Sequence, residues 1–344
     1  MPLELADAGL LLLSFLAPFL LLVVGIPPYL RLLVRMGKVS DDVHKIPPSK
    51  VPEPAGPILF IGALVGELVV AVGFHSWVPV AISLGAGFAF LVGLWDDLYV
   101  LGGRTKPLLL LLAGLAFVGV ILFESNLYEP ALSFPLLGDT NPHFIIYTAL
   151  AIVAFPVVAN AFNMMDAFNG EISWFTLLAS LALLLGVTLH QMYATGFSLD
   201  RVASTLPLVA VASAFLIFNR YPSKAFDGDS GSLMFGAMFA GLAVTGGVEI
   251  AAMIAIVPAI LNSFYTLSSV RGFVERRRMA SRPTLIGKDG LLHASTEPGA
   301  PNTLIRLVLL AGPRSERDLV RDVIALTGVA CLLSAAVSIL TWVY

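Results

Sequence analysis

A polar stretch with a regular spacing follows an apolar run near the middle of the chain. The run covers residues 145–158, and its polar followers are Asn160, Asn163, Asp166, Asn169 and the adjoining Gly170. On a helix this spacing keeps neighbouring side chains on one face while the stripe drifts around the axis. Polar side chains at a membrane boundary are costly unless they bind a ligand or one another, and glycine lets the backbone come close to a ligand. The stretch therefore predicts half of a binding site.

Four further polar clusters lie beside apolar runs. They are Asp41-Asp42-Val43-His44-Lys45, Asp96-Asp97 with Lys106, residues 219–232 with Phe226 and Asp229, and a long segment with Arg276-Arg277-Arg278, Arg282, Lys288 and His293. Paired carboxylates with amide neighbours suit Mg²⁺, a hard cation that prefers oxygen ligands. Lysine and arginine suit phosphate charge. Together the clusters predict a displacement at phosphorus at the bilayer surface, catalysed by positioning and charge neutralisation.

Each cluster taken alone has a simpler interpretation. Asp96-Asp97 could cap the end of a span and meet solvent, and Asp41-Asp42 could lie in a solvated loop. The arginine triplet could anchor the chain to anionic lipid, and Asn160 could form a hydrogen bond between helices. The site interpretation depends on all the clusters taken together, because acidic and basic clusters in complementary numbers lie on the same side of the expected membrane topology.

The composition defines the class of protein that positions these residues. Hydrophobic residues make up 58% of the chain and charged residues 12%, against about 25% charged in an ordinary soluble domain. The mean hydropathy is +0.89. The single cysteine, Cys331, excludes a disulfide framework and a cysteine metal cluster. The first apolar segment has no basic flank and is expected to be a retained helix, not a cleaved signal. The sequence predicts an all-α, polytopic membrane protein.

Ten apolar runs are long enough to cross a bilayer. They cover 9–30, 58–74, 78–95, 107–123, 144–162, 172–190, 204–219, 233–247, 250–268 and 321–343. We expect one membrane-embedded domain over 1–344, whose largest excursion is the loop segment 269–320.

The basic residues sort to one side of this ten-span topology. The loops on that side cover 31–57, 96–106, 163–171, 220–232 and 269–320 and hold, with the adjoining Arg321, every Lys and Arg except Arg201. The positive-inside rule places these loops in the cytoplasm and both termini outside. The candidate site residues then share the cytoplasmic face of a cell membrane.

The clusters, in this order, resemble the polyprenyl-phosphate N-acetylhexosamine-1-phosphate transferases (glycosyltransferase family 4). That family includes the bacterial phospho-MurNAc-pentapeptide translocase and the eukaryotic dolichyl-phosphate GlcNAc-1-phosphate transferase. The matching motifs are Asp42-Val-His-Lys45 before a Pro-rich turn, Asp96-Asp97 with Lys106, Asn160 to Gly170, and Phe226-Asp-Gly-Asp229-Ser-Gly-Ser232. Ala167 stands where many members have glycine, and Asn219-Arg-Tyr-Pro-Ser223 is closer to the dolichyl branch.

The resemblance implies a UDP-N-acetylhexosamine donor, a polyprenyl-phosphate acceptor, and Mg²⁺ with Mn²⁺ as a substitute. The lipid phosphate would attack the β-phosphorus, UMP would leave, and a polyprenyl-diphosphate-sugar would remain, as in the first membrane step of glycan assembly for N-glycosylation or the cell envelope. Nucleic acid is not an expected partner, and a homodimer is compatible with the family.

The family's site residues carry over by position. Asn163 and Asp229 would hold Mg²⁺, and Lys106 would meet the pyrophosphate. Asp96 and Asp97 would orient or deprotonate the lipid phosphate, and we favour orientation because that phosphate is already ionised near neutral pH. Asn169 would contact uracil. Further substrate contacts are implied for Asp42, Lys45, Asn160, Asp166, Gly170 and Phe226.

The last loop departs from the family pattern. Bacterial members carry clustered histidines there and eukaryotic members a short His-Arg-x-Pro-Arg motif, whereas this chain offers Arg282 and His293 as candidates for the same contacts. GlcNAc is the sugar expected from the dolichyl-like features. The looser bacterial match and the absence of a signal peptide point to an archaeal source.

Two alternatives remain. One is a bacterial-type wall-precursor transferase that moves another phospho-sugar. The other, from a different class, is a secondary transporter. Against transport, the charged residues do not lie in mid-span as a substrate path requires, and no two-fold repeat is visible.

Overall fold

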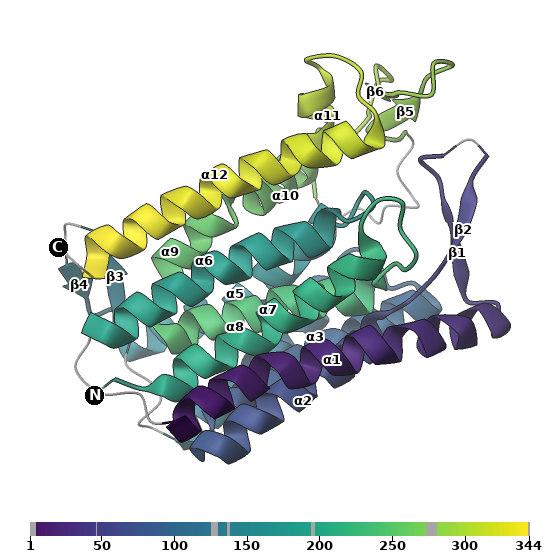
Figure 1. Cartoon of the computed structure of the whole chain (residues 1–344). Helices are drawn as coiled ribbons and strands as arrows, with labels where there is room; N and C mark the ends of the chain where they lie inside the picture. The colour runs from purple at the N-terminus through teal and green to yellow at the C-terminus, as the bar shows by residue number, and fades with distance from the viewer. Residues whose placement is uncertain are drawn as a thin grey trace.

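Long helices packed side by side form almost the whole molecule in the computed structural model (Figure 1). The structure describes residues 5–45, 47–124, 130–135, 138–193, 197–272 and 281–342. The basic triplet at 276–278 lies outside these residues. The helices are α1 (Leu5–Arg35), α2 (Gly56–Phe74), α3 (Val78–Tyr99), α4 (Thr105–Phe123), α5 (Phe144–Met165), α6 (Glu171–Tyr193), α7 (Leu199–Asn219), α8 (Gly228–Gly246), α9 (Glu249–Ala255), α10 (Val257–Ser269), α11 (Leu304–Leu309) and α12 (Glu316–Trp342).

Strands are few among the described residues. They form three antiparallel hairpins: β1 (Val39–Asp42) with β2 (Ser49–Pro52), β3 (Leu132–Phe134) with β4 (Gly138–Thr140), and β5 (Thr284–Ile286) with β6 (Leu292–Ala294). The all-α, polytopic prediction is confirmed.

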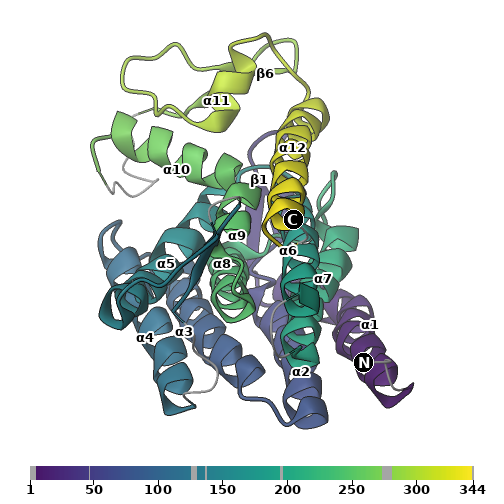
Figure 2. The same cartoon turned by 90° about the vertical axis from the view of Figure 1, so that its left-hand side faces the viewer.

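Eight described helices are long and apolar enough to cross a membrane, namely α1 to α7 and α12. The expected span 250–268 is broken in the structure, because α9 and α10 meet at an angle of 67°. Pro258 lies in the first turn of α10, where its ring would clash with the carbonyl four residues earlier and it has no N–H to continue the helix. Figure 2 shows α10 projecting from the side of the bundle beside α11.

Helix α8 is the centre of the bundle. Its 19 residues are rich in glycine and serine, and nearly all of them are buried. A helix enclosed by other helices needs no lipid-facing apolar surface. This explains why α8 is not among the eight helices that are apolar enough to cross a membrane. The neighbouring helices come very close: a Cβ on Gly236 would lie 2.6 Å from Cα of Ala159, and one on Gly93 would lie 2.4 Å from the carbonyl oxygen of Asp229.

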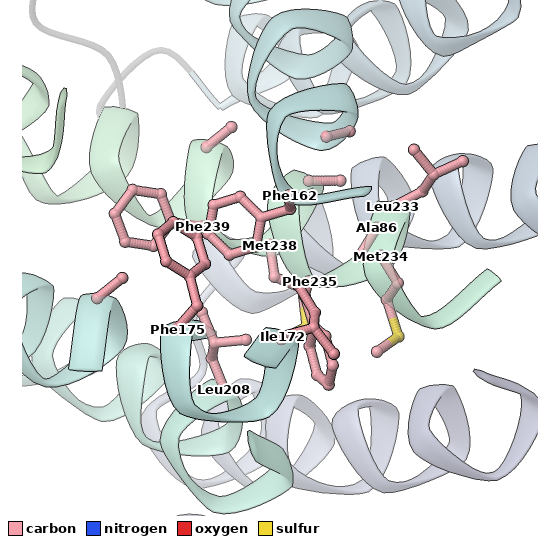
Figure 3. Packing of buried hydrophobic residues seen from close by; sticks show 14 of the residues in the cluster. Ala86, Phe162, Ile172, Phe175, Leu208, Leu233, Met234, Phe235, Met238 and Phe239 are labelled. Carbon is pink, nitrogen blue, oxygen red and sulfur yellow. The ribbon is translucent and has the colours of Figure 1, made fainter. Parts of the chain in front are cut away.

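Aromatic rings fill the space around the middle of α8 (Figure 3). Phe162 of α5 contacts Phe175 of α6 edge to face, with ring centroids 4.9 Å apart, and contacts Phe239 of α8 at 5.4 Å. All three rings are essentially inaccessible to solvent. This packing ties α5 and α6 to α8, and so positions the polar ends of those helices.

The polar segments gather at one end of the bundle. Figure 1 shows the β1–β2 hairpin, the β5–β6 hairpin and the start of α12 at that end, while α1 begins and α12 ends at the opposite end.

Candidate active site

The first turn of α8 is held by the end of α3. Both carboxylate oxygens of Asp97 accept hydrogen bonds there: Oδ1 from the Asp229 N–H at 2.8 Å, and Oδ2 from the Ser230 N–H at 3.1 Å and the Ser230 hydroxyl at 2.5 Å. Gly228 has a φ of +71°, and a Cβ there would lie 2.9 Å from the Asp97 carboxylate. Asp97 therefore fixes the helix start that presents Asp229.

Lys106 lies between two carboxylates at this helix start. Its Nζ is 2.5 Å from Oδ2 of Asp96 and 2.7 Å from Oδ2 of Asp229. Asn163, from the end of α5, donates from Nδ2 to Oδ1 of Asp229 at 2.5 Å and to the Ser232 hydroxyl at 2.9 Å. Three helices and the start of a fourth thus bring together four predicted residues that lie up to 133 positions apart in the sequence.

This cluster fits a divalent cation. Two carboxylates share the positive charge of the Lys106 ammonium, so the site already concentrates negative charge around a cation. Carboxylate and amide oxygens are the ligands that Mg²⁺ prefers. Asp229 and Asn163 supply both types in direct contact, and rotation of the Asn163 amide would turn its oxygen toward the same position.

A second cluster lies around Asn169. Oδ2 of the buried Asp42 accepts a hydrogen bond from Lys45 and one from Nδ2 of Asn169 at 2.9 Å. Burial alone would raise the pKa of Asp42, but these hydrogen bonds outweigh it and hold the pKa below its ordinary value. Lys45 also lies over the Tyr221 ring, with Nζ 5.3 Å from the centroid. The β1–β2 hairpin is thereby attached to the loop after α5.

Glu316, in the first turn of α12, completes this second cluster. Its Oε1 accepts hydrogen bonds from the Asn169 backbone N–H at 3.1 Å and from Nδ2 of Asn169 at 2.6 Å. Ligand atoms of Asp42, His44 and Glu316 lie within 4.8 Å of one another, a spacing that could also hold a metal ion. However, Oδ2 of Asp42 is already bonded to Lys45 and Asn169. A cation there would have to displace the Lys45 ammonium.

Three other predicted residues lie at the edges of these clusters. Asp166 follows the end of α5, and its charge acts on Asp227, whose pKa is raised well above its ordinary value by burial and by the Asp166 charge. Gly170 has a φ of +82°, and a Cβ there would lie 3.0 Å from Cα of Arg220. Phe226 donates its N–H to the Pro52 carbonyl at 3.0 Å, which joins the loop before α8 to β2.

Asn160 is not brought into either cluster. Its Nδ2 donates to the Pro156 carbonyl of its own helix at 2.7 Å.

Among the described residues of the last loop, Arg282 lies beside the turn between β1 and β2. A cavity of about 210 Å³ is lined by Arg282, Thr284, Leu285 and Ile286 from one side and by Val43 and His44 from the β1–β2 turn. His44 in turn stacks on Phe168 with ring centroids 4.2 Å apart. His293 instead contacts Asp289 of its own hairpin at 3.1 Å.

Comparison with known proteins agrees with these motifs. Residues 79–247, which include Asp96, Lys106, Asn163 and Asp229, match the model of glycosyl transferase family 4. A protein of Methanocaldococcus jannaschii that is provisionally named a glycosyltransferase is 32% identical over 82% of this chain and 82% of its own length. This chain belongs to glycosyl transferase family 4.

Two further relatives of this family 4 transferase carry more specific provisional names. One, from Sulfolobus acidocaldarius, is named UDP-N-acetylglucosamine–dolichyl-phosphate N-acetylglucosaminephosphotransferase and is 24% identical over 90% of each chain. The other, from Bacillus subtilis, is named undecaprenyl-phosphate N-acetylglucosaminyl 1-phosphate transferase and is 26% identical over 72% of this chain and 66% of its own.

The sequence motifs of this family 4 transferase do not point to Glu316 or to the serine contacts of α8. Glu316 begins a helix, where an acidic residue is ordinary because it interacts favourably with the helix dipole. Glu316 lies 147 residues from Asn169 in the sequence. Its sequence context therefore does not distinguish it from an ordinary surface acid. Ser230 and Ser232 belong to the motif that begins at Phe226. Both are fully buried in the structure.

Proposed function

We propose that this family 4 transferase moves N-acetylhexosamine 1-phosphate from a UDP-sugar to a polyprenyl phosphate. The observation that carries the proposal is the contact of Lys106 with Asp96 and Asp229, beside Asn163, at one end of a membrane-spanning bundle. Related proteins are named for the same transfer to dolichyl or undecaprenyl phosphate. GlcNAc is the proposed sugar and a dolichyl-type lipid the proposed acceptor.

The reaction is a displacement at phosphorus. An oxygen of the lipid phosphate bonds to the β-phosphorus of the UDP-sugar, and the bond from that phosphorus to the oxygen bridging the two phosphates breaks. UMP leaves with the bridging oxygen and its electron pair, and the lipid keeps a diphosphate linked to the sugar. Little bond chemistry is left for protein groups, so rate comes from positioning and charge neutralisation.

The residues of the first cluster divide this task. Lys106 binds the diphosphate and neutralises charge on the leaving UMP. Asp96, next to it, orients the incoming lipid phosphate, while Asp97 holds the start of α8 in place. A divalent cation held by Asp229 and Asn163, with Mg²⁺ proposed, supplies further positive charge to the diphosphate when bound.

The second cluster and the last loop bind the donor. Asn169, held by Asp42, contacts the uracil. Arg282 faces the β1–β2 turn across the shared cavity and binds phosphate or sugar oxygens there. The basic residues in the loops at this end favour its placement in the cytoplasm.

Release of UMP by the purified full-length protein tests the proposal. The assay contains polyprenyl phosphate, Mg²⁺ and one of several UDP-sugars, with Asp229→Ala as the test variant. Asp139→Ala is the matched control, because Asp139 is an exposed carboxylate of β4 away from the clusters. We expect UMP that depends on lipid and cation, a loss of about 100-fold or more in Asp229→Ala, and no change in the control. If folded protein releases no UMP with any sugar, the proposal fails; a secondary transporter would give that result.

A further inference from the structure

Glu316 contacts the nucleotide side of the site without being part of any motif. It comes from the first turn of α12 and uses one oxygen, Oε1, to accept both N–H groups that Asn169 offers on that side. Glu316 as a whole residue is 7% exposed. The helix start itself is capped by Ser315, whose hydroxyl accepts the Asp318 N–H at 3.2 Å. Glu316 is therefore directed at Asn169 and not at its own helix.

The two carboxylates around Asn169 allow only one orientation of its amide. An ionised carboxylate accepts hydrogen bonds and donates none. Both hydrogens of Nδ2 are used, one by Oδ2 of Asp42 and one by Oε1 of Glu316. If the amide were flipped, its oxygen would face two acceptors. Oδ1 must consequently point to the other side.

The fixed amide leaves one acceptor without a donor. Asn169 is 2% exposed, and its Oδ1 receives no hydrogen bond from any residue that the structure describes. A buried acceptor without a donor costs free energy, which a ligand donor can recover. The nucleobases differ at this point: uracil carries a donor at N3, whereas N3 of cytosine is an acceptor.

We propose that Glu316 is a positioning residue that sets the choice of nucleobase, because it holds Asn169 so that an acceptor faces N3 of the base. This rests on the proposed contact of Asn169 with the base of a UDP-sugar. Glutamine at position 316 has both a donor and an acceptor, so it removes one of the two restraints on the Asn169 amide and leaves Asp42 as the other. A fraction of the molecules would then present Nδ2 to the base. Cytosine would then be tolerated.

Direct binding of UDP and CDP to the purified full-length protein tests this proposal without turnover. We expect the wild type to prefer UDP by about 100-fold, since a site built around one hydrogen bond strongly rejects a base that lacks its donor. In Glu316→Gln the preference should fall by about tenfold or more, mainly through weaker UDP binding. Asp318→Asn is the matched control, because it removes an acid from the same helix turn that bonds Ser315 and not Asn169.

Turnover adds a readout that a loss of structure would not produce. The KM for the UDP-sugar should rise in Glu316→Gln, while kcat and the KM for polyprenyl phosphate stay near the wild-type values. If Glu316→Gln does not fold, Asp42→Asn loosens the same amide and should lower the same preference.

Three results would overturn the proposal. One is an unchanged UDP-to-CDP ratio in a folded variant, and another is an equal loss of both nucleotides. The third is a wild type that binds UDP and CDP alike. If the wild type also releases no UMP, the proposed function fails with it; if UMP release is normal, only the role of Glu316 is wrong.

Discussion

Lys106 is the residue that we propose acts on both substrates, through the diphosphate of the donor and through Asp96 beside the lipid phosphate. Its ammonium lies between Asp96 and Asp229, and its side chain is 15% exposed. Removing the charge leaves two carboxylates facing each other in a partly buried position, where like charges repel strongly. It also removes the group that we propose binds the diphosphate.

We predict that Lys106→Gln lowers kcat by about 100-fold to 1,000-fold, the usual loss for one group that stabilises transition-state charge. Steady-state UMP release measures it. Lys50→Gln is the control, since Lys50 is exposed on β2. An unchanged kcat in a folded Lys106→Gln variant would remove Lys106 from the site.

The lowered pKa of Asp42 predicts how the stability of the protein depends on pH. Its folded-state pKa lies below the ordinary value of 3.8. A group with a depressed pKa contributes stability that is fully present above the unfolded pKa and is lost as the pH falls through the folded pKa. The difference in Tm between wild type and Asp42→Asn should stay constant from about pH 8 to about pH 5 and shrink below about pH 4.

Thermal unfolding in detergent across this range measures the effect, with Asp41→Asn as the control because Asp41 is exposed on the same strand. A difference that grows on acidification would show that Asp42 is not stabilised as an anion.

At the scale of elements, the junction of α3 and α8 positions Asp229, one of the two proposed metal ligands. Asp97 accepts three hydrogen bonds from the first turn of α8, and Gly93 lets the two helices approach so closely that no Cβ fits between them. The position of Asp229 thus depends on α3, which also carries Asp96. The geometry favours a structural role for Asp97 over a catalytic one.

We predict that Asp97→Asn destabilises the protein and lowers activity together. An amide can accept at only one oxygen, so its NH₂ would face a donor of α8, and the lost charge-assisted bonds are worth about 1.5–3 kcal/mol each. Thermal unfolding and UMP release should be measured on the same preparation. Full stability with lost activity would instead assign Asp97 to the reacting groups.

At the scale of the whole molecule, hydropathy predicts most of the helices but not how two of them are shaped. It finds the eight long apolar helices, since lipid-facing helices must be apolar along their length. Hydropathy does not predict the break before Pro258, because α9 and α10 are apolar on both sides of the bend. The predicted run 233–247 covers the apolar part of α8 but not its polar start from Gly228, which other helices enclose.

The candidate site likewise contains residues that the sequence predicts and one that it does not. Asp96, Lys106, Asn163 and Asp229 lie in dense polar motifs at helix ends, and the structure brings them together as the motifs predict. Glu316 could not be found from its neighbours in the sequence, because only the fold places α12 against the loop after α5.

The proposed function requires the sugar to move together with its phosphate. The most direct test uses a UDP-sugar labelled with ³²P at the β-phosphorus, purified protein, Mg²⁺ and polyprenyl phosphate, followed by extraction of the lipid. We expect the label to enter the lipid fraction in step with the sugar and the released UMP to be unlabelled. Label that stays in water as UDP while the sugar enters the lipid would show cleavage of the sugar–phosphate bond, and the proposed function would then be wrong.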